Sequence, residues 1–163
     1  MATPLIGIKA LLDDLQDRLE TLTASIVLLK RDGTTETTLN VYLRSIPNEL
    51  LGPNPDEEDE GREYPYLVLR QISGRDGAQA GTLLVRCFIG IFNPGADFAG
   101  EDDLEAILSA ILQLPLAQDF APFALLPEIT FQFGSEKEGA QGVDKYFMTA
   151  DLHFSREAIY LNY

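Results

Sequence analysis

The stretch TLLVRCFIGIF, residues 82–92, decides the fold together with YLVLRQI, residues 66–72. Both stretches are rich in β-branched and aromatic residues and are too short for buried helices, so they predict β-strands. The segment between them, SGRDGAQAG at 73–81, is rich in glycine and is typical of a turn. The centre of the chain is therefore expected to be a β-hairpin with a flexible tip. The glycines at 74, 77 and 81 match neither a dinucleotide-binding nor a P-loop pattern.

Both strands of this hairpin carry apolar side chains on both faces. Successive side chains of a strand alternate between the faces of the sheet. One face would hold Leu67, Leu69, Val85, Cys87, Ile89 and Ile91, and the other Tyr66, Val68, Ile72, Phe88 and Phe92. Strands of this kind lie at the centre of a sheet and are covered on both sides.

Two segments outside the hairpin have the periodicity of amphipathic helices. In the first, Thr3 is suited to cap the helix and Pro4 to occupy its first position. In the second, the acids 101–103 load the first turn and Pro115 ends the helix. The apolar stripes are Leu5, Ile8, Leu11, Leu12, Leu15, Leu19 and Leu22 in the first helix, and Leu104, Ile107, Leu108, Ile111 and Leu112 in the second.

The remaining strands complete the expected sheet. A hairpin runs from 26–30 through a two-residue turn at Asp32-Gly33 into a return strand at 35–43, and two final strands lie near 128–133 and 145–155. The polar segment 134–144 is expected to be a loop. These elements predict one domain over residues 1–163. Its fold class is α+β, with a mostly antiparallel sheet of about five or six strands and two main helices packed on one face.

An acidic loop is expected at 46–64, where prolines and glycines interrupt the pattern. Its centre is the run Asp56, Glu57, Glu58, Asp59 and Glu60, whose mutual repulsion favours a mobile, solvated segment. The run resembles a calcium-binding loop only weakly, because Leu67 stands at the position that needs a bidentate Glu. The loop is a candidate for contact with a partner or for facing a DNA channel, and a loop that is merely solvated is the alternative.

Composition excludes several classes of protein. The 163 residues contain 12 Lys and Arg against 26 Asp and Glu, a formal charge of −14, which argues against sequence-independent nucleic-acid binding. A single Cys and a single His rule out a disulfide framework or a zinc ribbon. No apolar run is long enough to span a membrane and no signal peptide is apparent, so a protein of a reducing compartment is expected.

Catalytic motifs are missing from the chain. His153 falls on the polar face of the last strand and Cys87 on an apolar face, where it is expected to be a small buried hydrophobe. No nucleophile elbow, zinc-protease or kinase motif is present. We therefore expect no enzyme activity, no cofactor and no metal.

Two helices are too few to cover both faces of such a sheet. If both pack on one face, the apolar residues of the other need a cover. The C-terminal segment could supply part of it and a neighbouring subunit the rest. The candidate residues for this subunit interface are Tyr66, Val68, Arg70, Arg86 and Phe88.

The order of segments resembles that of the small tail proteins encoded in the head–tail region of tailed phages of Gram-positive bacteria. The similarity extends over residues 3–155 and is best at Tyr64-Pro65-Tyr66, which leads into a strand, and over the strand, loop and helix of 83–112. The matching segments are VYLRSIPNE, YPYLVLRQ, TLLVRCFIGIFNPGADFAGEDDLEAILSAILQ, LLPEITFQFG and KYFMTADLHF.

This resemblance implies a tail terminator or a closely related tail-completion protein. Such a protein has an α+β fold and forms a ring, commonly a hexamer, at the head-proximal end of the tail tube. Its partners would be copies of itself, the tail tube protein and the head connector or neck protein, with DNA passing through without specific binding. It would be assembled in the cytoplasm of the host bacterium and reside in the virion. The alternatives are a head-completion or neck ring protein, and a cytoplasmic ligand-binding α+β domain, which a bound metabolite or a monomeric state would favour.

Overall fold

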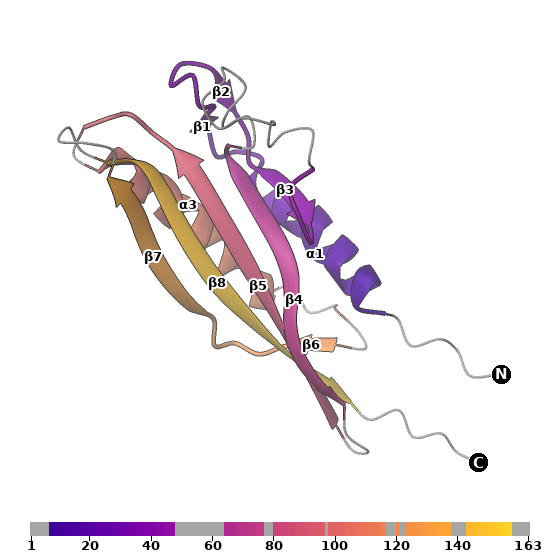
Figure 1. Cartoon of the computed structure of the whole chain (residues 1–163). Helices are drawn as coiled ribbons and strands as arrows, with labels where there is room; N and C mark the ends of the chain where they lie inside the picture. The colour runs from indigo at the N-terminus through magenta and orange to yellow at the C-terminus, as the bar shows by residue number, and fades with distance from the viewer. Residues whose placement is uncertain are drawn as a thin grey trace, which may run out of the picture.

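The computed structural model describes residues 7–47, 64–76, 80–96, 98–116, 120, 123–137 and 143–157. The residues in these ranges form two α-helices and eight strands (Figure 1). They are α1 (Ile8–Thr23), β1 (Leu28–Leu29), β2 (Glu36–Thr37), β3 (Asn40–Leu43), β4 (Tyr66–Asp76), β5 (Ala80–Phe92), α3 (Ala99–Ile111), a 3₁₀ turn (Leu114–Leu116), β6 (Phe123–Leu125), β7 (Thr130–Lys137) and β8 (Val143–Glu157).

Six of the strands form one sheet in the order β3-β4-β5-β8-β6, with β7 also paired to β8. All of these pairs are antiparallel except β3 with β4, which run parallel. The other two strands, β1 and β2, make a small separate hairpin. The expected α+β fold with a mostly antiparallel sheet of five or six strands is confirmed.

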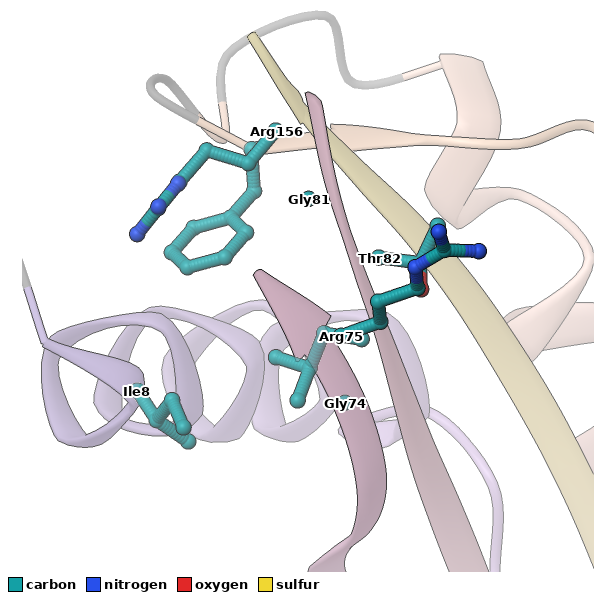
Figure 2. A pocket seen from close by; sticks show the side chains of 8 residues that line it. Ile8, Gly74, Arg75, Gly81, Thr82 and Arg156 are labelled. Carbon is teal, nitrogen blue, oxygen red and sulfur yellow. The ribbon is translucent and has the colours of Figure 1, made fainter. Parts of the chain in front are cut away.

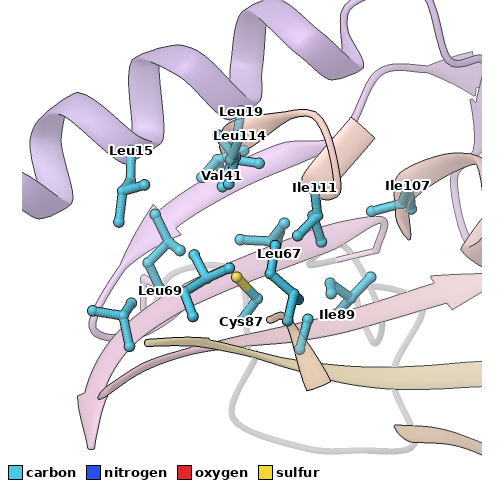
Figure 3. Close-up of a cluster of buried hydrophobic side chains, with 14 of the residues drawn as sticks. Leu15, Leu19, Val41, Leu67, Leu69, Cys87, Ile89, Ile107, Ile111 and Leu114 are labelled. Atoms are coloured by element: carbon cyan, nitrogen blue, oxygen red, sulfur yellow. The ribbon is translucent and has the colours of Figure 1, made fainter. Parts of the chain in front are cut away.

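Both helices pack on the same face of this sheet (Figure 1). Helix α1 lies against β3 and β4, while α3 lies against β5 and β8. Figure 3 shows the core that forms between the layers, where Leu15 and Leu19 of α1 and Ile107 and Ile111 of α3 face the sheet. The apolar residues on this side of β4 and β5 are almost completely buried, as the alternation of the sequence predicts.

The opposite side of the sheet is called here the open face. Among the residues that the structure describes, no helix packs on it. The expectation that β4 and β5 are covered on both sides is met on the helix side, and cover of the other face stays a prediction. These strands are central in the sheet, and α1 and α3, of 16 and 13 residues, both pack on the same face.

The ends of the helices differ in detail from expectation. Helix α1 begins at Ile8 with Gly7 as its N-cap, and the expected capping residues Thr3 and Pro4 lie outside the described residues. Ile8 is 37% exposed because it lies in the first turn. Leu112, expected in the buried stripe of α3, is 46% exposed because the helix has already ended at Ile111.

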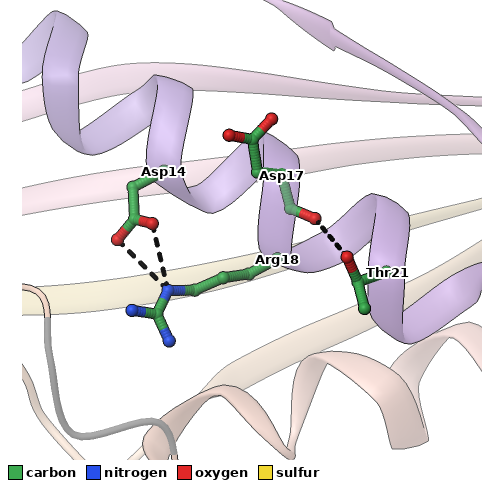
Figure 4. A network of polar contacts seen from close by, with 4 residues as sticks. All are labelled: Asp14, Asp17, Arg18 and Thr21. Atoms are coloured by element: carbon green, nitrogen blue, oxygen red, sulfur yellow. Dashed lines mark hydrogen bonds and ion pairs between the residues drawn. The ribbon is translucent and has the colours of Figure 1, made fainter.

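Helix α1 turns its polar side away from the core. Arg18 Nε donates to both carboxylate oxygens of Asp14, at 3.1 and 3.2 Å, one turn earlier on the helix (Figure 4). The guanidinium of Arg18 also lies 4.5 Å from the ring centroid of Phe120, so its stem covers part of the core. Asp17 and Glu20 are exposed, as expected of a solvated helix face.

The expected return strand 35–43 is two strands. Residues 36–37 pair with β1, whereas 40–43 leave that hairpin and join the main sheet beside β4. Burial explains the division, because Leu39 and Val41 are each only 4% exposed and fill the space beneath α1. The edge of β3 is also tied to the helix, since Gln16 Nε2 donates to the carbonyl oxygen of Val41 at 2.8 Å.

A turn does form at Asp32-Gly33, but its loop is longer than two residues. Lys30 N donates to Thr35 O, and Gly33 adopts a φ of +73°. The Asp32 carboxylate accepts hydrogen bonds from the amides of Thr34 and Thr35 and from the Thr35 hydroxyl, and these bonds lower the pKa of Asp32 from 3.8 to about 2. The side chain of Asp32 thus organises the turn, as Asx turns do.

The long strands continue further than expected. Strands β4 and β5 stay paired as far as Asp76 and Gly81, so Gly74 and Gly81 belong to strands rather than to a loop. A side chain at Gly74 would place its Cβ 3.2 Å from the carbonyl oxygen of Thr82, so glycine permits the close approach of the two backbones. Strands β7 and β8 likewise pair through residues 134–137 of the expected loop, and the short β6 was not foreseen.

Candidate interaction surface on the open face of the sheet

The five residues proposed for a subunit interface lie together on the open face. The register of β4 with β5 places Tyr66 opposite Gly90, Val68 opposite Phe88, and Arg70 opposite Arg86. Residues that face each other in an antiparallel pair project to the same side of the sheet. The sequence-based grouping of these residues on one face is therefore confirmed, while their role in an interface is still a prediction.

Aromatic residues form one part of this surface. The ring of Tyr66 lies over Gly90, so closely that any Cβ at that position would collide with it. Tyr64 packs against Tyr66 with ring centroids 5.3 Å apart. Phe88 is half-buried beside them, and Val68 is 6% exposed. Tyr66 and Phe88 are half-buried and keep part of their rings accessible, and aromatic residues are enriched at protein interfaces.

Charged residues form the next row along the strands. Arg86 of β5 donates to Asp151 of β8 through Nε at 2.7 Å and Nη2 at 3.1 Å, and this hydrogen bonding raises the pKa of Arg86. Arg70 is exposed on the other side of Arg86. Sequence reasoning does not identify Asp151 as the partner of Arg86, because their pairing depends on the register of β5 with β8.

The single Cys and the single His lie on opposite faces. Cys87 is fully buried on the helix side, and burial, with a smaller effect of Asp151, raises its thiol pKa to about 12. It is a core hydrophobe, as expected. His153 is half-buried on the open face, opposite Leu84. In the part of the chain that the structure describes, no group of three or more His, Cys, Asp or Glu could hold a metal ion.

A pocket of about 290 Å³ lies at the far end of the sheet, away from the aromatic part of the open face. Arg75 and Arg156 both line it, but Figure 2 shows their side chains directed away from each other. The two guanidinium groups therefore do not converge on one anion. Its remaining lining residues are Ile8, Gly74, Gly81, Thr82, Leu83 and Phe123.

Two further expectations concern the acidic loop and membrane-spanning segments. The acidic loop residues Asp56, Glu57, Glu58, Asp59 and Glu60 lie outside the described residues. Within the described ranges, no helix is long and apolar enough to cross a membrane.

Comparison with known proteins adds no assignment. The chain matches no family model, and no curated protein is significantly similar to it in sequence. The open face and the pattern of the sequence are therefore the features that bear on function.

Proposed function

We propose that this chain is a structural protein of a phage tail, a tail terminator that forms a ring at the head-proximal end of the tail tube. The ring stops growth of the tube and joins the tail to the head connector. It contains six copies, by the resemblance of the sequence, and is assembled in the host bacterium before it becomes part of the virion.

The observation that carries this proposal is the open face of the sheet. A ring subunit needs a large surface that it does not cover with its own chain. Here the long strands β4, β5 and β8 bring aromatic side chains and arginines to a face on which no helix of the described residues packs. Aromatic residues and Arg are the types enriched at protein interfaces.

The charge of the chain suits a ring through which DNA passes. With 26 acidic against 12 basic residues, the protein as a whole repels a polyanion at long range. DNA would then slide through the ring without specific binding. The acidic run at 56–60 contributes five of these charges and is proposed to contact a basic patch on the tube or on a neighbouring ring.

Cryo-electron microscopy of virions and isolated tails tests this proposal. We expect density for this chain at the head-proximal end of the tube, in a copy number that matches the symmetry of the tube. Deletion of the gene should give overlong or headless tails. Density at the head connector without contact to the tube would instead assign a neck ring, and absence of the chain from both places would overturn the proposal.

A further inference from the structure

The open face carries exposed arginines although the chain is strongly acidic. Pairing with β5 places Arg70 and Arg75 of β4 on this face, and pairing of β8 with Phe92 places Lys145 there as well. Arg70 and Arg75 are exposed, whereas Arg86 is bound to Asp151 and Lys145 is only 9% exposed. Asp151 is the one carboxylate among the described side chains of the face, and the backbone register also pairs Glu136 with Lys145 and Glu157 with Ala80. The charges that this face offers to a partner beside its aromatic residues are therefore those of the exposed Arg70 and Arg75.

The outer surface of the two helices, here called the helix layer, is acidic. Helix α3 contains no Lys or Arg. In α1, Arg18 is one of only two basic residues and is bound to Asp14. The exposed carboxylates of the layer are Asp13, Asp17 and Glu20 on α1 and Glu101, Asp102 and Glu105 on α3. Those of α1 follow one another at steps of four and three residues and so form a single stripe on the helix.

These two surfaces lie on opposite sides of the same chain. The open face spans about five strand positions and about ten residues of strand, which corresponds to roughly 800 Å² at about 4.8 Å between strands and about 3.3 Å per residue. That is close to the roughly 800 Å² that each partner contributes to a stable interface of standard size. A surface of this size with aromatic residues and two exposed arginines matches a partner that is acidic.

We propose that the open face binds the helix layer of a second copy of this chain. The inference rests on the proposed ring and specifies how its subunits meet. The two contacting surfaces differ, so a copy that binds one neighbour through its open face still has its helix layer available for another. Each added copy therefore has the same orientation relative to the previous one. Heterologous contacts of this type close into rings when the rotation between copies permits. Each sheet then has a helix layer on both sides, which accounts for strands that are apolar on both faces.

Charge reversal on each surface tests this arrangement. The sheet variant carries Arg70→Glu and Arg75→Glu, and the helix variant carries Asp17→Lys and Glu105→Lys, all at exposed positions. The matched controls Lys30→Glu and Glu36→Lys reverse exposed charges in the small hairpin, outside both surfaces. Self-association is measured by sedimentation up to about 1 mM protein at low salt, a range that detects millimolar dissociation constants.

The wild type and the controls are expected to associate, and added salt should weaken the association because it screens exposed charges. Each double variant alone should associate at least tenfold more weakly. An equimolar mixture of the two variants should recover association, because each surface of one variant meets a surface of opposite charge on the other. Native mass spectrometry should then show the two variants alternating.

Three results would overturn the inference. They are a wild type that stays monomeric over this range, folded variants whose mixture associates no better than either alone, and a sheet variant that loses affinity for DNA while its self-association is unchanged. Circular dichroism confirms that each variant is folded, and Arg70→Gln with Arg75→Gln is the milder replacement if the reversal unfolds the chain. The location of the chain in virions is measured separately, so failure of this contact and failure of the proposed function are distinguishable.

Discussion

Arg86 of β5 holds Asp151 of β8 through two hydrogen bonds, at 2.7 and 3.1 Å, while its other neighbour across the sheet is Arg70 of β4. Three charged residues thus stand in one row on the open face, and two of them are cations. Arg86 is bound to Asp151 within the chain, whereas Arg70 is exposed and would face the neighbouring copy in the proposed contact. Arg70 is therefore expected to lower the stability of the single chain but to favour association between chains.

Replacement of Arg70 should separate its effect on stability from its effect on association. Like charges directly opposite each other on paired strands are unfavourable, so Arg70→Thr is expected to raise the free energy of unfolding of the monomer by roughly 0.2–1 kcal/mol. The same substitution should weaken association of the chains. Denaturant unfolding measures the first effect and sedimentation the second, with Gln71→Thr, at an exposed neutral position of the same strand, as the control. A less stable monomer would contradict this account of the row.

Truncation in the core should be costly at the centre of α3. Ile107 is fully buried between α3 and the sheet. Ile107→Ala removes apolar contacts and leaves a cavity, so a loss of about 2–5 kcal/mol in unfolding free energy is expected. The control Glu105→Ala lies on the exposed side of the same helix and should change stability by no more than about 0.5 kcal/mol. Equal midpoints for the two variants would show that α3 does not pack on the sheet in this way.

Gly100, in the first turn of α3, is expected to be intolerant of any side chain. A Cβ there would overlap the ring of Tyr146, which is itself 1% exposed and has no space to move. Gly100→Ala should therefore destabilise the chain by about 1–3 kcal/mol despite the better helix propensity of alanine. A Cβ at Gly134 meets nothing within 4 Å, so Gly134→Ala is the matched control and should be close to neutral by thermal unfolding.

Asp103 should make the stability of the chain depend on pH. Burial raises the pKa of this carboxyl above its ordinary value of 3.8, an effect that the hydrogen bond from Asn93 opposes and the nearby Asp102 reinforces. Because the pKa of Asp103 is higher in the folded chain than in the unfolded chain, ionisation of this carboxyl lowers the free energy of unfolding. This loss develops as the pH rises through 3.8 and then through the folded-state pKa. The substitution Asp103→Asn keeps an acceptor for Asn93 without the charge.

The Asp103→Asn variant is thus expected to have a higher thermal midpoint than the wild type at about pH 7. The difference should shrink as the pH falls below 3.8, where Asp103 is protonated in both the folded and the unfolded state. Midpoints of both proteins from about pH 3 to about pH 7 provide the check. A gap that widens toward low pH would have the wrong sign for this mechanism.

The acidic run tests the proposed function in the virion. Replacing Asp56, Glu57, Glu58, Asp59 and Glu60 with Ser and Asn should leave the fold intact, since an exposed charge contributes no more than about 1 kcal/mol. If the run contacts the tube or a neighbouring ring, the variant should give overlong or headless tails in a complementation assay. Full production of infectious particles would show that the run is only solvated.

Most of the core was predictable from periodicity. Leu12, Leu15 and Leu19 recur at helical spacing, and Cys87 and Ile89 at strand spacing, and all of them are buried as expected. Such patterns are local, because a helix or strand buries whichever of its faces is apolar. The same alternation places the five residues of the candidate surface on one face, so the sequence alone is sufficient to group them.

The missed elements depend on contacts between distant segments. The separation of β3 from β2 reflects the parallel pairing of 40–43 with 66–69, a segment well separated along the chain. The glycines at 74 and 81 belong to strands because backbone hydrogen bonding between β4 and β5 continues past them. Side-chain patterns do not predict such backbone pairing. Likewise, β6 is three residues long and exists only where it meets the end of β8.

The amino-acid order alone was enough to establish two amphipathic helices, a central hairpin that is apolar on both faces, and an acid excess of fourteen charges. Pairing between strands was needed to join Arg86 to Asp151, to set Arg70 beside Arg86, and to bring Arg75 to the same side of the sheet, opposite the side on which the helices lie. The reason is physical: periodicity assigns each side chain to a face of its own element, whereas the neighbours on that face are chosen by the register between strands.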